Sequence, residues 1–293
     1  MSSNDVKPRV ALLGLGLMGT GMGHRLLAAG FPLAVFNRNR DKAATLERDG
    51  AVVAASPREA AAGASIAVAM VADDHASRAV WLGANGALAG LARGSVLVDS
   101  STLTVEWVRE LAAAAAANGC ELLDAPVTGS KMQAASGELN FLVGGSSAAL
   151  ERARPVLAVM SRSIVHVGPT GSGAMLKLIN NFLCGVQAVS AAEALALIER
   201  SGLDRAKAIE VLTGGAPGSP ILKTMWSRMT SGDFTPNFRM ALMAKDMGYA
   251  VKEGARNEVT LTTAASALDS FTRAMAAGHG DEDFSAVVRP IRD

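Results

Sequence analysis

The chain has 293 residues, of which 49% are hydrophobic and 19% are charged, and its formal net charge is +1 at pH 7. This composition excludes intrinsic disorder and indicates a globular protein long enough for two domains. The balanced charge and the low aromatic content, 4%, argue against nucleic acid as a partner.

The amino terminus and the most apolar stretch both favour a cytoplasmic protein. MSSNDVKPRV lacks the charged region and the apolar region of a signal peptide. Residues 182–198 are apolar, but Gln187, Ser190 and Glu193 interrupt them, so a buried or interface helix explains them better than a membrane span. We therefore expect a cytoplasmic protein without a membrane segment.

Residues 9–19, RVALLGLGLMG, run from an apolar strand into a glycine-rich turn and a helical pattern that ends at Gly30. Gly14 would allow a tight turn, Gly16 would let the backbone approach a pyrophosphate, and Gly19 would let the helix pack closely. A glycine-rich turn without a ligand is the alternative. The strand, fingerprint and helix together predict a dinucleotide site, with these cofactor contacts: Gly14, Gly16, Leu17, Met18 and Gly19.

The second strand ends about 20 residues after the fingerprint, where an NAD site has an acidic residue for the ribose hydroxyls. This chain has Asn37 there, followed by Arg38 and Arg40. Guanidinium groups suit a 2′-phosphate, although ordinary solvated arginines are the alternative. We predict NADP(H) rather than NAD(H), with these three residues as contacts.

Further strands are predicted at 65–73, 95–101 and 119–127, separated by helical segments. This alternation predicts a mostly parallel sheet with helices on both faces, and ligands bind beyond the carboxyl ends of such strands. Thr128, Gly129 and Ser130 offer hydroxyls and an approachable backbone to a carboxylate, but a plain polar turn is the alternative. The other residues expected at this edge are Asp73, Asp74, Ser100, Ser101 and Thr102.

The strand pattern stops after His166, and GPTGSG at 168–173 opens a helical pattern that runs to about Glu199. A helix of that length spans about 40 Å, so we expect it to link two domains. We predict a dinucleotide-binding Rossmann domain at 1–168 and an all-helical substrate and dimerisation domain at 169–293. The second domain is rich in Ala, Leu and Met, which indicates a homo-oligomer, a dimer or a tetramer.

The sequence offers no pattern for metal or serine-hydrolase chemistry. Its four histidines are scattered without an HxxxH or HExxH pair, and GxSxG does not occur. We therefore predict no metal site.

Lys177 stands in the apolar run GSGAMLKLINN at 171–181, and Asn181 shares its helix face. Burial of an ammonium is costly unless the charge is used. The alternative is a lysine whose stem is covered while its ammonium reaches water.

Four motifs occur in an order and at spacings that resemble the β-hydroxyacid dehydrogenase family: GLGLMG, DAPVTGSK, GSGAMLKLINN and the KDM at 245–247. The resemblance covers nearly the whole chain. That family includes 3-hydroxyisobutyrate dehydrogenases, tartronate semialdehyde reductases and glyoxylate/succinic semialdehyde reductases. It implies a Rossmann domain, a long connecting helix and an all-α domain, with hydride transfer between NADP(H) and a small hydroxy acid or its semialdehyde.

The resemblance also implies roles for single residues. Lys177 would be the general acid/base, since an ammonium can polarise a carbonyl and donate a proton as hydride arrives. Asn181 would contact the substrate beside it. The other implied roles are the substrate carboxylate for Thr128, Gly129 and Ser130, closure of the site for Phe238 and Asp246, the nicotinamide for Thr102, and the cofactor for Lys245.

Some positions depart from the family pattern. Many members have Ser-Gly-Gly where this chain has Thr128, Gly129 and Ser130, and added bulk of this order shifts selectivity by roughly 1 to 3 kcal/mol. The loop GSK and the NR pair after the second strand are most similar to the glyoxylate/succinic semialdehyde reductases. The residues that differ from that branch are Met132, Gln133 and Arg239.

Two other functions are compatible with the same scaffold. An imine reductase resembles it but usually has another residue in place of Lys177. A non-catalytic nucleotide-binding protein could keep the fold without the chemistry. Lys177 argues against the first, and its presence together with Asn181, Thr128 and Thr102 argues against the second.

Overall fold

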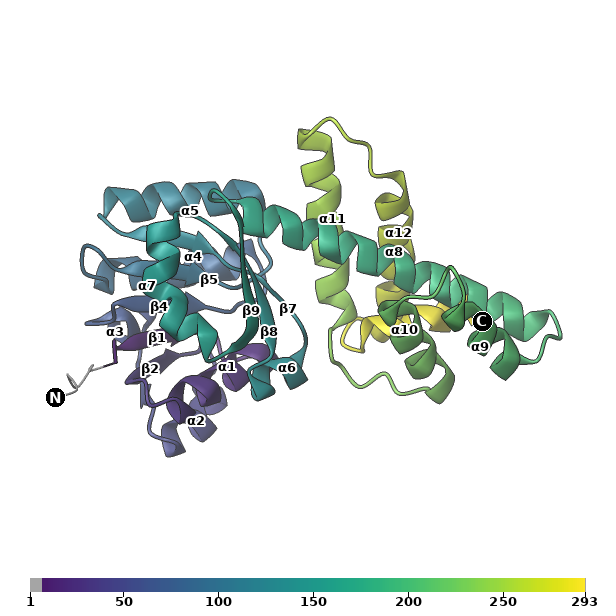
Figure 1. Ribbon diagram of the computed structural model, residues 1–293, viewed down its shortest axis with the longest axis horizontal. Helices are drawn as coiled ribbons and strands as arrows, with labels where there is room; N and C mark the ends of the chain where they lie inside the picture. The colour runs from purple at the N-terminus through teal and green to yellow at the C-terminus, as the bar shows by residue number, and fades with distance from the viewer. Residues whose placement is uncertain (1–6, 293) are drawn as a thin grey trace. The chain divides into compact units, whose positions relative to one another are not determined.

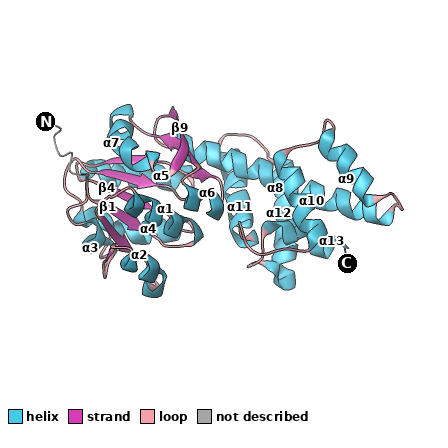
Figure 2. Cartoon of the chain, turned by 60° about the horizontal axis from the view of Figure 1, so that its bottom comes forward, coloured by secondary structure: helices cyan, strands magenta, loops and turns pink. Residues whose placement is uncertain are grey.

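The computed structural model describes residues 7–292, which form two compact units, the first ending at Lys177 and the second beginning at Leu178. Every strand of the described residues lies in the first unit, whereas the second is helical (Figure 2). This confirms the predicted fold class of a Rossmann domain followed by a helical domain. The domain boundary at residue 168 stays a prediction.

The first unit is built on one sheet with the strand order β3-β2-β1-β4-β5-β6-β8-β7, with β9 beside β8. The strands from β3 to β6 are all parallel, and β8 runs antiparallel to β6. This is the order of a dinucleotide-binding sheet with additions at one edge. The bounds are β1 (Val10–Leu13), β2 (Leu33–Phe36), β3 (Val52–Val53), β4 (Ile66–Ala69), β5 (Val96–Asp99), β6 (Glu121–Asp124), β7 (Val127–Thr128), β8 (Leu139–Gly144) and β9 (Ser161–Gly168).

Successive residues of the central strands pack into two different cores, because side chains alternate between the faces of a sheet. Leu12 packs with residues of α1 and α7, and Leu13 packs with residues of α4 and α5. Figure 1 shows helices on both sides of the sheet, as predicted. The helices of this unit are α1 (Leu17–Ala28), α2 (Ala44–Arg48), α3 (Pro57–Ala61), α4 (Asp74–Leu82), α5 (Val105–Ala117), α6 (Lys131–Ser136) and α7 (Ser147–Ala158).

Helix α8 (Ser172–Arg200) leaves the first unit and continues into the second. Among residues 7–292 it alone has the length and composition of a membrane span, with a hydropathy of 1.5 in its most apolar window. Half of that window is buried inside the protein. Its bounds confirm the long helix expected from the sequence.

The second unit surrounds a core rich in methionine. Met240, Met243, Met247 and Ala250 recur at the spacing of one helix face, and all four are buried. Gly232 ends α10 with a φ of 70°, which a glycine adopts without strain. The helices are α9 (Arg205–Gly214), α10 (Pro220–Ser231), α11 (Met240–Arg256), α12 (Thr262–Ala274) and α13 (Arg289–Arg292).

Candidate active site

The three fingerprint glycines lie in surroundings that match their predicted roles. Gly14 has a φ of 98°, and a Cβ there would lie 2.3 Å from the carbonyl oxygen of Met70. A Cβ on Gly19 would lie 2.0 Å from the carbonyl oxygen of Gly14, so any side chain would push α1 away from the strand. Gly16 has no such neighbour within 4 Å and is exposed. Two glycines thus close the turn, and the third leaves its backbone open to a ligand.

The amino terminus of α1 is electrostatically suited to an anion. Its N-cap, Gly16, has no side chain, and the first turn contains no acidic residue. The N–H groups of that turn and the positive end of the helix dipole are therefore left for a ligand. Leu17 is half exposed beside this end, and Met18 is partly buried. These residues fit the pyrophosphate of a dinucleotide.

Asn37, at the end of β2, ties two loops of this edge together. Its Oδ1 accepts from the N–H of Leu15 at 2.8 Å, and its Nδ2 donates to the carbonyl oxygen of Asn39 at 2.8 Å. Arg38 is exposed and makes no hydrogen bond or ion pair with any residue from 7 to 292. Arg40 is also exposed, and its guanidinium lies 3.5 Å from Glu47. The structure therefore gives Asn37 a structural part and leaves both arginines accessible.

Side chains also join the loops that follow β4 and β5. The N–H of Val71 donates to Oγ of Ser101 at 2.9 Å. The Asp74 carboxylate accepts from both the N–H and the hydroxyl of Thr104, at 2.9 and 2.6 Å. Thr102 lies between these two links and is partly buried. The structure thus holds the loop of Thr102 in place from both sides.

Asp99, the last residue of β5, is buried beneath that loop with 1% of its surface exposed. It accepts from Oγ of Ser77, Nε1 of Trp81 and the N–H of Ser101, at 2.6, 2.8 and 3.0 Å. Burial raises the pKa of Asp99, and these hydrogen bonds offset only part of the effect. Asp99 therefore supports the loop from inside the core.

The hydroxyl of Thr128 is oriented by a chain of side chains on neighbouring strands. Oγ of Ser163 donates to Oδ1 of Asn140 at 2.7 Å, and Nδ2 of Asn140 lies 3.3 Å from Oγ1 of Thr128. Oγ1 of Thr128 accepts this hydrogen bond from Asn140, and its hydroxyl donates to no residue between 7 and 292. Its hydroxyl proton is therefore left for an acceptor such as a substrate carboxylate.

Ser130 has a different environment. Its N–H and its hydroxyl both lie within hydrogen-bond distance of Oε1 of Gln133, at 2.9 and 2.8 Å. This is a capping box at the start of α6, and the pattern S-x-x-Q could have predicted it from the sequence. We expected Ser130 to donate hydrogen bonds to a substrate carboxylate, but both of its donors are engaged by Gln133. Thr128 is therefore better placed to bind that carboxylate.

The start of α8, which carries Lys177, is bound to the end of β6. Oδ1 of Asp124 accepts from the N–H of Gly171 at 2.8 Å, and Oδ2 accepts from the N–H of Ala174 at 2.9 Å. Burial raises the pKa of Asp124, against these backbone hydrogen bonds. Lys177 follows one turn after Gly173 and is partly buried. The Asp124 carboxylate thus holds the turn that precedes Lys177.

Three predicted residues of the second unit meet at Asp246, which is 1% exposed. Its Oδ2 accepts from Nδ2 of Asn181 at 2.6 Å. Nζ of Lys245 lies 2.9 Å from Oδ1 but off the direction of a hydrogen bond, so this contact is an ion pair. Oδ1 keeps its capacity to accept a hydrogen bond. Asp246 therefore orients the amide of Asn181.

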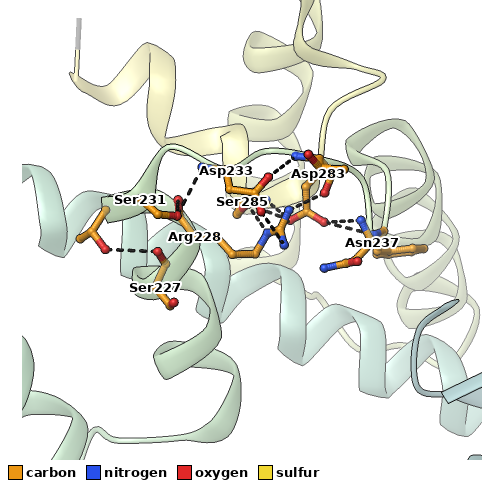
Figure 3. A network of polar contacts seen from close by, with 10 residues as sticks. Ser227, Arg228, Ser231, Asp233, Asn237, Asp283 and Ser285 are labelled. Carbon is orange, nitrogen blue, oxygen red and sulfur yellow. Dashed lines mark hydrogen bonds and ion pairs between the residues drawn. The ribbon is translucent and has the colours of Figure 1, made fainter. Parts of the chain in front are cut away.

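Phe238 follows Asn237 in a segment whose backbone is bound by Asp283, and Figure 3 shows Asn237 beside Asp283. Oδ2 of Asp283 accepts from the N–H groups of Asn237 and Phe238 at 2.9 and 3.1 Å. Nε of Arg228 lies 3.2 Å from Oδ1, and Figure 3 shows this side chain reaching toward Asp283 and Ser285. The Phe238 ring packs edge-on against the ring of Phe284, with the two centroids 5.8 Å apart.

Sequence reasoning missed Asp124, Asn140, Asp283 and Arg228 as supports of the site. For Asp124 no signal was present in the sequence, because Thr170 and Ser172 beside the helix start are residue types that can cap a helix themselves. For Arg228 and Asp283 no local pattern joins two residues so far apart in the chain.

Known proteins are similar to this chain over nearly its whole length. Residues 9–168 match the family model of the NAD binding domain of 6-phosphogluconate dehydrogenase, and residues 171–291 match that of the NAD-binding of NADP-dependent 3-hydroxyisobutyrate dehydrogenase. The chain is 36% identical to the NAD-dependent L-serine dehydrogenase of Pseudomonas aeruginosa, over 95% of this chain and 96% of that one. It is 33% identical to glyoxylate/succinic semialdehyde reductase 1 of Arabidopsis thaliana, over 97% and 98%.

A solved structure of Mycobacterium tuberculosis 3-hydroxyisobutyrate dehydrogenase with L-serine is similar as a whole. It superposes with a TM-score of 0.90 at 34% identity, and the match covers 98% of this chain and 100% of that chain. The structural likeness therefore extends over both halves of the chain.

Proposed function

Because the chain belongs to the β-hydroxyacid dehydrogenase family and is an oxidoreductase with NAD(P)-binding domains, we propose that it transfers hydride between NADP(H) and a small 3-hydroxy acid or its semialdehyde. The observation that carries this proposal is the position of Lys177. It lies one helical turn before Asn181, whose amide is bound to the buried Asp246 carboxylate. Lys177 serves as the general acid/base.

The fingerprint turn and the residues after β2 support NADP(H) as the cofactor, which supplies or accepts the hydride when bound. The backbone at Gly16 and the amino terminus of α1 receive the pyrophosphate. Arg38 and Arg40 are exposed and can pair with a 2′-phosphate, and Asn37 brings no carboxylate to repel it. Thr102 and Lys245 complete the proposed cofactor contacts.

Thr128 and Gly129 bind the substrate carboxylate in this proposal. The hydroxyl proton of Thr128 is available because its oxygen already accepts from Asn140. Lys177 donates a proton to the carbonyl oxygen during reduction and takes it back from the hydroxyl during oxidation. L-serine, bound by the solved relative, has a hydroxyl on the carbon next but one to its carboxylate, as a 3-hydroxy acid does.

The family pattern supplies the remaining proposed roles. Asn181 contacts the substrate, with Asp246 and Phe238 as further substrate residues, and Ser130 contributes if its hydrogen bonds to Gln133 open. We further propose a cytoplasmic homo-oligomer, a dimer or a tetramer. Exposed apolar residues of the second unit support this, because Leu197 and Val211 are 71% and 70% exposed. Light scattering coupled to size exclusion tests the oligomer.

Initial rates test the proposed activity. NADPH and NADH are each supplied with glyoxylate, succinic semialdehyde, tartronate semialdehyde and methylmalonate semialdehyde, and oxidation of the nicotinamide is followed by absorbance. We expect turnover that favours NADPH and falls about 10² to 10⁴-fold in Lys177→Ala. Lys223→Ala, which removes an exposed lysine of α10, is the matched control and should retain the wild-type rate.

Two results would contradict the proposal. Equal rates for wild type and Lys177→Ala would remove Lys177 from the chemistry. Tight NADPH binding without turnover of any of these four aldehydes would favour a protein that only binds the nucleotide.

A further inference from the structure

The first turn of α8 is capped from a distance. In an ordinary capping box, the N-cap side chain accepts the N–H of the third helical residue, and that residue's side chain accepts the N-cap N–H. Here the N-cap is Gly171 and the third residue is Ala174, so neither side chain can accept. A single carboxylate, Asp124, accepts from both N–H groups across 47 and 50 residues of sequence.

Six other helices of the described residues do not need this device, because a side chain at the N-cap accepts from their own first turn. These N-cap residues are Ser56, Asp73, Thr104, Ser146, Asp204 and Ser219. Because α8 lacks such a residue, its starting point is set by a strand of the sheet rather than by its own sequence. The helix that carries Lys177 is thereby fixed to β6.

Close packing around the Asp124 carboxylate and the first turn of α8 restricts both to one arrangement. A Cβ on Gly144 would lie 2.6 Å from Oδ1 of Asp124, so this glycine makes room for the carboxylate. A Cβ on Gly173 would lie 2.3 Å from the carbonyl oxygen of Leu142, so the first turn rests directly on β8. Gly171 has a φ of 94°, which a residue with a side chain adopts only under strain. The helix start therefore has little freedom to shift.

Strand β6, which ends at Asp124, also leads to Thr128. Asp124 ends β6, and Thr128 follows four residues later in β7. One short segment thus carries both the proposed carboxylate contact and the cap of the helix that bears the proposed acid/base. Any shift of the first turn of α8 would move Lys177 with it, because Lys177 lies one turn beyond Gly173.

We propose that Asp124 is a positioning residue, whose carboxylate fixes the first turn of α8 on the sheet and so sets the place of Lys177. The catalytic part of this inference rests on the proposed function. A misplacement of about 1 Å at a reacting group costs on the order of 10²-fold in rate, so a modest movement of the turn is sufficient to be measured.

Asp124→Asn is the main test variant. Its amide oxygen can accept from one of the two N–H groups, while its NH₂ faces the other as a second donor. The matched control is Ser95→Ala, which removes a buried hydrogen bond, from Ser95 Oγ to the carbonyl oxygen of Ala64, at the amino end of β5. Both variants lose buried polar contacts in the first unit, but the control does not touch α8.

Hydrogen exchange measured by mass spectrometry tests the anchor without any activity. We expect the peptide that covers 169–178 to exchange at least about tenfold faster in Asp124→Asn and at the wild-type rate in Ser95→Ala. Unchanged exchange in Asp124→Asn, or equally fast exchange in both variants, would overturn the proposal. Asp124→Ala provides a second variant, with the same expectation, if Asp124→Asn does not fold.

Steady-state kinetics tests the link to Lys177. We expect kcat to fall at least about tenfold in Asp124→Asn while KM for NADPH stays within about twofold, because the fingerprint turn is untouched. In a Lys177→Ala background the same substitution should have little further effect. An equal fall in both backgrounds would overturn the positioning role. If wild type turns over no substrate, the proposed function fails, and hydrogen exchange alone decides the anchor.

Discussion

Asp124 and Asp283 are buried carboxylates, each 1% exposed, that hold the backbone of a candidate site segment, one in each unit. Asp124 accepts from two backbone N–H groups at the start of α8 and forms no ion pair with any residue from 7 to 292. Asp283 accepts from the N–H groups of Asn237 and Phe238 and also pairs with the guanidinium of Arg228. The carboxylate of the first unit is thus bound by neutral donors alone, whereas that of the second unit is bound by neutral donors and by a charged guanidinium.

The two arrangements differ in the donors that remain when the carboxylate is removed. Neutral N–H groups that lose a carboxylate can donate to another acceptor or to water at a modest cost. The Arg228 side chain is 13% exposed and keeps its charge when the Asp283 carboxylate is removed. Its remaining ion-pair partner, Asp233, is exposed and lies 4.0 Å away, and a buried charge that is poorly compensated is costly. The segment of Phe238 should therefore be more sensitive to substitution than the start of α8.

The largest expected effect is that of Asp283→Ala. Removal of the carboxylate leaves Arg228 without its buried partner and the N–H groups of Asn237 and Phe238 without their acceptor. We expect the free energy of unfolding of the second unit to fall by about 3 to 5 kcal/mol. Urea denaturation followed by hydrogen exchange of second-unit peptides measures it.

The double variant Arg228→Met/Asp283→Leu is the control for this effect. It removes both charges and should lose clearly less stability than the sum of the two single variants. A purely additive result would mean that the pair is not coupled, and the comparison with Asp124 would then have no basis.

Asp124→Asn should destabilise the first unit less, by about 1 to 3 kcal/mol, because it leaves unsatisfied donors but no unpaired charge. Urea denaturation of the intact chain, read from first-unit peptides, gives this value beside that for Asp283→Ala. A loss as large as that of Asp283→Ala would break the distinction between neutral and charged donors.

Acidity should affect Asp124 in an unusual direction. Its pKa is raised above the ordinary 3.8, first by burial, so the folded protein binds a proton more readily than the unfolded chain does. The part of the stability that comes from proton binding at Asp124 is therefore fully present below pH 3.8 and is lost as the pH rises through the folded pKa. One group changes the free energy of unfolding by at most about 1.4 kcal/mol per pH unit.

Urea denaturation of wild type and Asp124→Asn at a series of acidic pH values checks this dependence. The stability of wild type should fall more steeply with rising pH than that of the variant. Asp99, whose pKa is also raised by burial, should keep its own contribution in both proteins. Identical slopes for the two proteins would contradict the assigned cause.

The sheet and the fingerprint were predictable because their signals are local. Apolar runs mark β1, β4 and β5, and the glycine spacing marks the turn after β1. β9 was missed because its residues are partly or fully exposed and include Arg162 and His166, so the sequence shows no strand periodicity. The supports of the site were missed for a different reason: the contacts of Asp124 and of Asp283 join distant residues, and spacing along the chain does not encode them.

The smallest effect in this series should come from a support made of neutral groups alone. Asn140→Ala removes the amide that lies 3.3 Å from Oγ1 of Thr128 and the acceptor of Ser163. The hydroxyl of Thr128 would keep its place on β7 but lose its preferred orientation, since no other residue from 7 to 292 contacts it by a hydrogen bond. We expect KM for the acid substrate to rise about three- to tenfold, which corresponds to about 1 kcal/mol, with KM for NADPH unchanged.

Initial rates at varied substrate concentration measure this change in KM. Asn140→Asp is the matched variant, because it keeps the acceptor for Ser163 and removes the donor to Thr128. A variant Asn140→Asp that behaves as wild type would show that Thr128 needs no orienting donor, and the neutral support would then be structural only.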